Sequence, residues 1–133
     1  MFTIPIQLRF NDVDVMGHVN NAVIMEFFDL GKSQYFAAAG VPVRPDEDDF
    51  CVMIVHYEVD FLSQIRYGDE VEVCTQVVRW GNKSFEVRQQ VTANGTPAVT
   101  CKTVMAGYSR KAGAAATIPD EVKERVRQYD ATH

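Results

Sequence analysis

The sequence predicts an α+β fold in which a curved antiparallel sheet of five or six strands wraps around one long central helix. Only one long stretch, residues 22–39, is apolar at helical spacing, and most later segments alternate apolar and polar side chains. These segments are separated by turn residues, and strands joined by hairpin turns are antiparallel neighbours. With 133 residues, 47% of them hydrophobic, the chain is predicted to form a single domain over residues 1–133.

The first strand is predicted over residues 4–10, where every second side chain is apolar. The helix is predicted over residues 22–39, and Gly40 supplies its C-terminal stop. Glu26, Asp29 and Ser33 form a narrow polar stripe at a spacing of three to four residues. We therefore expect this helix to be buried around most of its circumference.

Four further strands follow, at residues 51–61, 71–77, 85–91 and 99–108. In the first of them, every odd position is expected on one apolar face. Turns are predicted at residues 67–69 and 80–83 and at Asn94-Gly95, which is the strongest hairpin signal. Residues 113–116 form a short spacer, and residues 119–129 are expected to form a brief polar helix with proline at its start.

Composition excludes several classes of protein. The net charge is −5 and the 13 basic residues are scattered, which argues against a nucleic-acid surface. No stretch approaches the roughly 18 apolar residues of a membrane span, and the N-terminus lacks the basic and apolar regions of a signal peptide. The three cysteines have no CxxC spacing and indicate reduced thiols. We expect a cytoplasmic protein without a membrane or nucleic-acid partner.

The candidate site is the ten-residue segment DVDVMGHVNN at residues 12–21, between the first strand and the helix. It concentrates carboxylate, imidazole and amide groups where a loop delivers them to a helix N-terminus. The N–H groups of a helix N-terminus and the helix dipole polarise a carbonyl oxygen. Taken alone, the Asp-x-Asp pattern is also typical of turns and helix caps. Asp12 is assigned this structural role.

Two other motif interpretations fail on the same residues. A calcium-binding EF-hand loop that began at Asp12 would need an oxygen ligand at Met16 and a glutamate at Val23. A phosphatase with an aspartyl nucleophile would need a buried parallel sheet with several crossover helices, whereas the first strand alternates and one long helix is present. No metal or redox cofactor is expected.

The order of several motifs resembles the hot-dog-fold acyl-CoA thioesterases, specifically the 4-hydroxybenzoyl-CoA thioesterase-like group. The resemblance runs from Ile6 to Tyr108. It depends on the 12–21 segment, the acidic Asp29 on the helix, VDF at 59–61, YGDEV at 67–71 and WGNKSF at 80–85. The resemblance implies the hot-dog fold and hydrolysis of a small or medium acyl-CoA thioester, aromatic acyl groups included, to the free acid and CoA.

It also implies roles for individual residues. Asp14 matches the catalytic carboxylate, and the backbone N–H groups of Asn20 and Asn21 match those that polarise the thioester carbonyl. Asp14 attacks the carbonyl or deprotonates a water, and the sequence leaves both routes open. His18 orients the substrate or accepts a hydrogen bond, and Gly17 permits close backbone approach or a positive φ.

The substrate and the assembly follow from the same resemblance. The acyl tail is expected between subunits along Val23, Ile24 and Phe27, and the CoA end near Lys83 and Ser84. A sheet with an uncovered edge invites pairing, so we expect a homo-oligomer, either a dimer or a dimer of dimers (a homotetramer). Two alternatives remain open: a non-catalytic acyl-CoA-binding or sensing module on the same fold, and an acyl-carrier-protein thioesterase.

Overall fold

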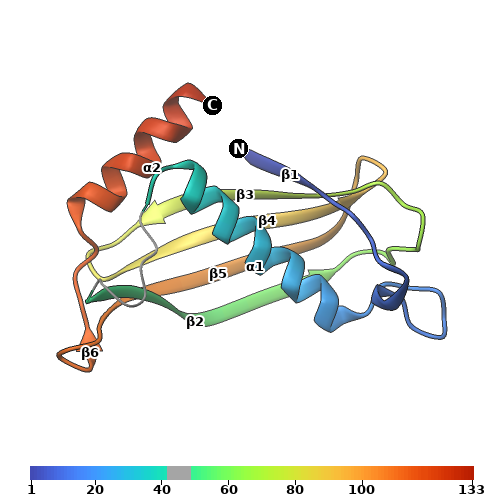
Figure 1. Cartoon of the computed structure of the whole chain (residues 1–133), viewed down its shortest axis with the longest axis horizontal. Coiled ribbons are helices and arrows are strands. Elements are labelled where there is room, and N and C mark those ends of the chain that lie inside the picture. The colour runs from blue at the N-terminus through green and yellow to red at the C-terminus, as the bar shows by residue number, and fades with distance from the viewer. Residues whose placement is uncertain (42–48) are drawn as a thin grey trace.

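The computed structural model describes residues 1–41 and 49–133. Its elements, in chain order, are β1 (Phe2–Ile6), the 3-10 helix η1 (Phe10–Asp12), α1 (Asn21–Ala38), β2 (Phe50–Phe61), β3 (Val71–Trp80), β4 (Ser84–Ala93), β5 (Thr96–Ser109), β6 (Ala114–Ala115) and α2 (Asp120–Thr132). Figure 1 shows α1 lying across one face of the sheet, with α2 beside the C-terminal end of α1.

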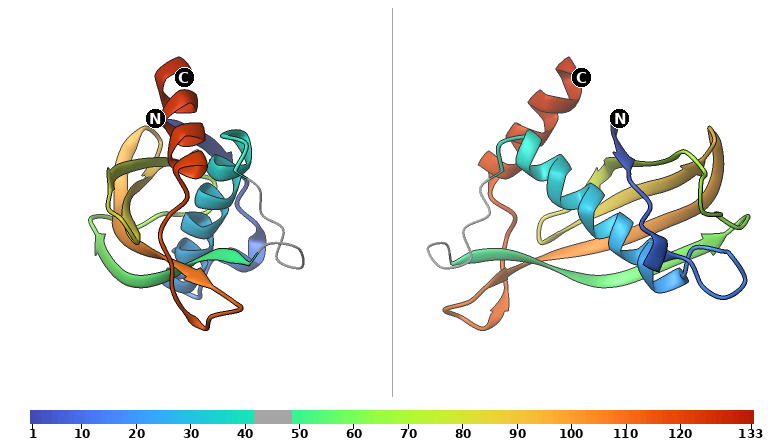
Figure 2. Two further views of the ribbon diagram at one scale, coloured as in Figure 1. Left: turned by 90° about the vertical axis from the view of Figure 1, so that its left-hand side faces the viewer. Right: turned by 45° about the vertical axis from the view of Figure 1, so that its right-hand side comes forward.

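The sheet has the strand order β1-β3-β4-β5-β2, and β6 pairs with the end of β5. All the pairings are antiparallel. Strands β3, β4 and β5 form a meander of consecutive hairpins, while β1 and β2 lie at its two edges. The two views in Figure 2 show the sheet curving around α1. The predicted α+β hot-dog architecture is confirmed.

Both ends of α1 follow from local chemistry. Asn20 is the N-cap, and its side-chain Oδ1 accepts a hydrogen bond from the Ala22 N–H at 2.8 Å. At the other end Gly40 has φ +78°, the left-handed conformation in which helices commonly end. The helix therefore begins and ends within one residue of the predicted 22–39.

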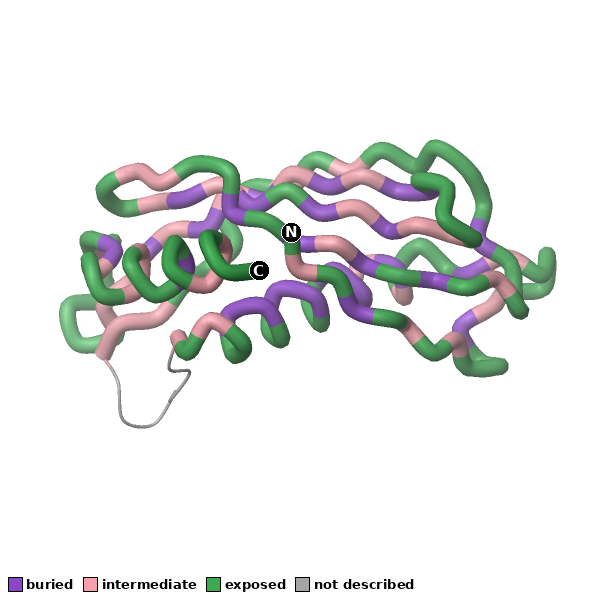
Figure 3. Tube along the Cα trace, turned by 90° about the horizontal axis from the view of Figure 1, so that it is seen from above, coloured by how far each residue is buried: buried purple, intermediate pink, exposed green. Residues whose placement is uncertain are grey.

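The expectation that α1 is buried around most of its circumference is wrong for the protomer. Its buried residues are Ile24, Phe27, Phe28, Gly31, Lys32, Tyr35 and Phe36, which all lie on the side that faces the sheet. Figure 3 shows these buried positions along one side of α1 and the alternation of buried positions along the strands. The sheet covers only one side, so Leu30 on the other side remains 43% exposed.

The core beneath α1 is divided by buried polar side chains. One apolar cluster packs around Ile24 and Phe28 near the helix start, and the other around Tyr35 and Phe36 near its end. Between them lies a row of polar residues that consists of Thr75 on β3, Gln89 on β4 and Thr103 on β5. The Gln89 Nε2 donates hydrogen bonds to the Phe28 carbonyl at 2.9 Å and to Thr75 Oγ1 at 3.0 Å. We call these three residues the polar row.

Strand β2 departs from the predicted alternation. Ile54 pairs with Met105 and His56 with Val104, so Val55 forms a bulge. Residues on opposite sides of a bulge lose the simple period of two, and the odd positions 51–61 therefore do not share one face. Before the bulge, the even-numbered Ile54 faces α1, paired with the buried Met105. After the bulge, the odd-numbered Tyr57 faces α1.

Helix α2 closes the end of the structure near the C-terminus of α1. Val126 is fully buried, and the Tyr35 hydroxyl donates to both carboxylate oxygens of Asp130 at 2.7 Å. The Phe2 ring stacks on Tyr35 with centroids 5.6 Å apart, which joins β1 to the same cluster. Neither helix in residues 1–41 and 49–133 combines the length and apolarity needed to cross a membrane.

Candidate functional site

The candidate loop between η1 and α1 is a tight turn held by its own backbone. The Asp14 N–H donates to the His18 carbonyl at 2.8 Å, and the Gly17 N–H donates to the Asp14 carbonyl at 3.0 Å. Gly17 has φ +78°, and a Cβ added there would meet no atom within 4 Å. Gly17 is therefore needed for its backbone conformation and not for close approach of another group.

The turn also fixes the Asp14 side chain. Its Oδ1 accepts from the Met16 N–H at 2.9 Å and from the His18 N–H at 3.3 Å. Its Oδ2 has no hydrogen-bond partner among residues 1–41 and 49–133, and the residue is exposed. One carboxylate oxygen thus performs the turn chemistry, while the other is open to a substrate or a water.

At the start of α1 the two asparagines differ. The Asn20 N–H donates to the Asp12 carbonyl at 2.9 Å, so it is already engaged. The Asn21 N–H has no acceptor in the part of the chain that the structure describes. Of the two backbone donors named from the sequence, Asn21 alone is open, and Asn20 contributes as the helix cap.

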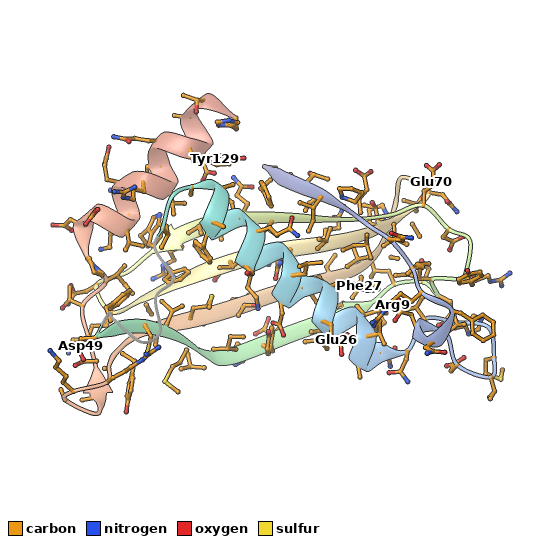
Figure 4. The ribbon with its side chains drawn as sticks, viewed as in Figure 1. Arg9, Glu26, Phe27, Asp49, Glu70 and Tyr129 are labelled. Atoms are coloured by element: carbon orange, nitrogen blue, oxygen red, sulfur yellow. The ribbon has the colours of Figure 1, made fainter. Side chains whose placement is uncertain are left out.

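An ion pair between the exposed Arg9 and the buried Asp12 supports the loop. Asp12 is 2% exposed and accepts from the Arg9 amide at 2.8 Å and from the Arg9 guanidinium at 2.9 and 3.1 Å. Burial alone would raise the pKa of the Asp12 carboxyl, but the hydrogen bonds and charge of Arg9 outweigh it and hold the pKa below its ordinary value. Arg9 also approaches Glu26 at 3.9 Å, and Figure 4 shows both near the start of α1. Asp12 has the structural role predicted for it.

The predicted acyl-contacting residues are not equally accessible. Val23 is half-buried, whereas Ile24 and Phe27 are only 3% and 6% exposed and belong to the core cluster near the helix start. Of the three, only Val23 presents surface beside the loop in the protomer.

Lys83 and Ser84 lie at the opposite end of the sheet from Asp14. They lie where the turn enters β4, and β4 runs for ten residues from there to the end of the sheet where the loop lies. At about 3.3 Å per residue this separation is roughly 30 Å. Within one protomer, therefore, the structure does not bring Lys83 and Ser84 together with Asp14.

A charged cluster, of which the sequence singled out only Asp29, lies on α1 against β2. Lys32 is 4% exposed, and its Nζ donates to the Tyr57 hydroxyl at 2.7 Å and lies 3.3 Å from Asp29 Oδ1. The Tyr57 hydroxyl in turn donates to Asp29 Oδ1 at 3.1 Å. Burial lowers the pKa of the Lys32 ammonium despite the opposing charge of Asp29, and burial raises the pKa of Tyr57. Lysine on an apolar helix gives no sequence signal of burial, because its long chain normally reaches solvent.

Metal ligands and cavities elsewhere in the described residues are the other features that bear on function. Within residues 1–41 and 49–133 no group of three or more His, Cys, Asp or Glu side chains is arranged to hold a metal ion. A cavity of about 290 Å³ lies on the sheet face away from α1, lined among others by Glu58, Asp60, Arg88 and Lys102. It shares no residue with the loop around Asp14.

Comparison with known proteins gives concordant matches. The sequence profile of the thioesterase-like superfamily matches residues 8–126. A 1,4-dihydroxy-2-naphthoyl-CoA hydrolase of Synechococcus elongatus is 28% identical over 100 residues, which cover 73% of this chain and 74% of the relative.

Two solved structures are similar over almost the whole chain. A Thermus thermophilus thioesterase, crystallised with coenzyme A and zinc, is 33% identical with a TM-score of 0.82, and the match covers 97% of this chain and 93% of the other. The structure of a predicted thioesterase from Bacillus stearothermophilus is 28% identical with a TM-score of 0.84, covering 96% and 95%. The family resemblance drawn from the loop and turn motifs is confirmed.

Proposed function

The chain belongs to the thioesterase-like superfamily and is a thioester hydrolase, and on that premise we propose that it hydrolyses an acyl-CoA with Asp14 as the catalytic carboxylate. The observation that carries the proposal is that the loop and the helix it leads into each offer one open group. Asp14 has a free Oδ2, and Asn21 has a free N–H at the N-terminus of α1. A thioester needs both a base or nucleophile and a donor for its carbonyl oxygen.

In the proposed reaction the thioester oxygen accepts a hydrogen bond from the Asn21 N–H. The positive end of the α1 dipole stabilises the negative charge that develops on this oxygen. Asp14 Oδ2 then attacks the carbonyl carbon and expels the CoA thiolate, or removes a proton from a water that attacks instead. Oδ1 keeps its two hydrogen bonds to the turn in either route, so the orientation of the carboxylate stays fixed. His18 is proposed to orient the substrate.

The acyl group is proposed to be small or medium in size, with aromatic acids as the first candidates. This follows from the Synechococcus relative, whose name specifies a dihydroxynaphthoyl thioester. The Thermus structure holds coenzyme A, and CoA is accordingly the proposed carrier. The acyl group would lie along Val23, at the half-buried start of α1.

We propose that the active unit is a homodimer joined through β2. This edge strand has twelve residues, contains no proline and carries exposed apolar side chains, including Met53 at 49% and Val55 at 61%. An edge of this kind pairs readily with another strand. The opposite edge, β1, has only five residues and contains Pro5. In addition Asp14 is exposed in the protomer, and a second chain would exclude water from it.

Pairing through β2 would also give Lys83 and Ser84 a role. A two-fold axis between antiparallel β2 strands turns the second sheet end for end. The β3–β4 turn of one protomer then lies at the same end as the Asp14 loop of the other. We propose that Lys83 and Ser84 contact the CoA of the second protomer and not that of their own.

The test of the catalytic assignment is Asp14→Asn, with release of free CoA as the readout. Asparagine keeps the Oδ1 acceptor that the turn uses, so folding and acyl-CoA binding should survive. Turnover should fall by about 10²–10⁴-fold. If Asp14→Asn turns over its best substrate as fast as the parent, the assignment is wrong. A parent that binds acyl-CoA but hydrolyses no CoA or carrier-protein thioester would support the binding-module alternative.

Isotope labelling separates the two routes. One turnover in ¹⁸O-water is followed by a second turnover in ordinary water. If Asp14 forms an anhydride that water opens at the aspartyl carbon, label enters the Asp14 carboxylate and appears in the second product. General-base catalysis labels only the first product.

The dimer is tested by Val55→Lys and sedimentation equilibrium. A lysine at this edge position should shift the protein toward monomer and reduce turnover. Val78→Lys is the matched control, because Val78 is also an exposed valine, 47% exposed, but lies on β3, which is separated from β2 by β4 and β5. Equal self-association of both variants and the parent would contradict pairing through β2.

A further inference from the structure

Arg66 lies beside the candidate site in the same protomer. Its backbone forms an antiparallel bridge with His18, and the Val19 N–H donates to the Ile65 carbonyl at 2.7 Å. His18 is in turn hydrogen-bonded to Asp14. Two backbone spacings of about 4.8 Å, from Arg66 to His18 and from His18 to Asp14, place the Arg66 backbone roughly 10 Å from that of Asp14. Lys83, in contrast, is at the far end of the sheet.

The guanidinium of Arg66 forms no ion pair with any carboxylate in residues 1–41 and 49–133, although the residue is exposed. Arg9, at the same end, is already occupied by Asp12 and Glu26. The nearest acidic side chain in sequence, Asp69, is used within its own turn. Its Oδ2 accepts from the Arg66 amide at 2.8 Å, and its Oδ1 accepts from the Asn94 side chain at 3.1 Å. A phosphate group would therefore meet an uncommitted cation at Arg66.

Two exposed aromatic rings accompany this cation. Tyr67 follows Arg66 directly and is 57% exposed, and Phe10 is 78% exposed. Their ring centroids are 6.3 Å apart with an interplanar angle of 80°. This aromatic pair includes the residue next to Arg66 in the chain, so a base could stack on it while the phosphates bind the cation.

We infer that Arg66, Tyr67 and Phe10 bind the 3′-phosphorylated adenine nucleotide of CoA at the Asp14 site of their own protomer. The inference rests on the proposed function, which places the thioester at Asp14. It assigns the nucleotide to a cis site next to the loop, whereas Lys83 and Ser84 would approach from the second protomer. The pantetheine arm would then run from Asp14 across His18 to Arg66.

The test compares one acyl group on two carriers, CoA and N-acetylcysteamine, which lacks the nucleotide. Arg66→Gln should raise KM for the acyl-CoA about tenfold, with kcat nearly unchanged, because it removes binding that is equal in the ground and transition states. Tyr67→Ala should act in the same direction through lost stacking. Neither variant should change kcat/KM for the N-acetylcysteamine thioester. Added salt should raise KM for acyl-CoA more in the parent than in Arg66→Gln.

The control is Arg127→Gln, which removes an exposed arginine on α2 and should leave every parameter at the parent value. An unchanged KM for acyl-CoA in Arg66→Gln overturns the inference while the proposed function stands. Equal damage on both carriers also overturns it, because the variant then distorts the loop. If the parent hydrolyses neither thioester, the proposed function fails. In that case calorimetric titration with CoA tests the nucleotide site directly. Loss of CoA binding in Arg66→Gln supports the site, and retained binding overturns it.

Discussion

Gly31→Ala is expected to destabilise the protein although it replaces glycine by a better helix former. Gly31 is the point of α1 that lies against the polar row. A Cβ there would lie 2.9 Å from Thr75 Oγ1, 3.0 Å from Gln89 Nε2 and 3.1 Å from Val73 Cγ1. All three distances are shorter than ordinary van der Waals contacts, and none of the three neighbours is the free end of a long surface side chain.

The magnitude follows from opposing contributions. Alanine gains about 1 kcal/mol over glycine in helix propensity. Overpacking a filled core costs about 1–3 kcal/mol. Displacing Gln89 weakens its two hydrogen bonds, each of which contributes about 1 kcal/mol. We expect a net loss of about 1–3 kcal/mol in the free energy of unfolding, which lowers Tm by roughly 3–12 °C for a domain of this size.

Urea denaturation of Gly31→Ala, monitored by circular dichroism, measures this loss. Ser33→Ala is the control, because Ser33 is exposed on the same helix and changes propensity without a steric conflict. In a Gln89→Ala background one crowded neighbour is gone, so the further loss from Gly31→Ala should be smaller. If Gly31→Ala is as stable as the parent, the close packing of α1 on the polar row is not what requires glycine.

Three further outcomes are expected. Asp12→Asn should lower Tm at pH 7 and have less effect at low pH, because the depressed Asp12 pKa contributes stability above the unfolded pKa that is lost as pH falls through the folded pKa. Tyr35→Phe should cost about 1–3 kcal/mol, measured by urea denaturation, through its lost hydrogen bonds to Asp130, and Asp130→Asn should cost less because it keeps an acceptor. In the parent, the pKa of Lys32 is lower in the folded than in the unfolded state, so stability rises with pH between these two values. Lys32→Met should abolish this rise of Tm at alkaline pH.

Much of the fold was predictable because local signals agree with the tertiary structure. The caps Asn20 and Gly40 bracket α1, and Asn94-Gly95 forms the predicted hairpin turn, with both residues at positive φ. The loop around Asp14 was recognisable because its residue types match one motif. The structural role that the sequence predicts for Asp12 agrees with its ion pair to Arg9.

The errors have physical causes. The bulge at Val55 inverts the face of later residues, and nothing in an alternating apolar run marks where a bulge lies. The exposed side of α1 carries apolar residues such as Leu30, so hydropathy overstated its burial. The position of Lys83 relative to Asp14 depends on strand direction across the sheet and cannot be read from a motif. The engagement of the Asn20 N–H by Asp12 is likewise a tertiary contact.

The two edge strands have a consequence for the order in which the protein assembles. The meander β3–β4–β5 pairs residues close in sequence, but β1 pairs Thr3 with Cys74 and β2 pairs Phe61 with Val99. Contacts of such long sequence separation form late, because a large loop must close first. During synthesis β1 leaves the ribosome first, but it cannot pair until β3 has also been synthesised. The candidate loop follows β1 and is held by Ile65, so it takes its shape only after the segment between β2 and β3 has joined it. Catalytic competence would then be among the last properties that a newly made chain acquires.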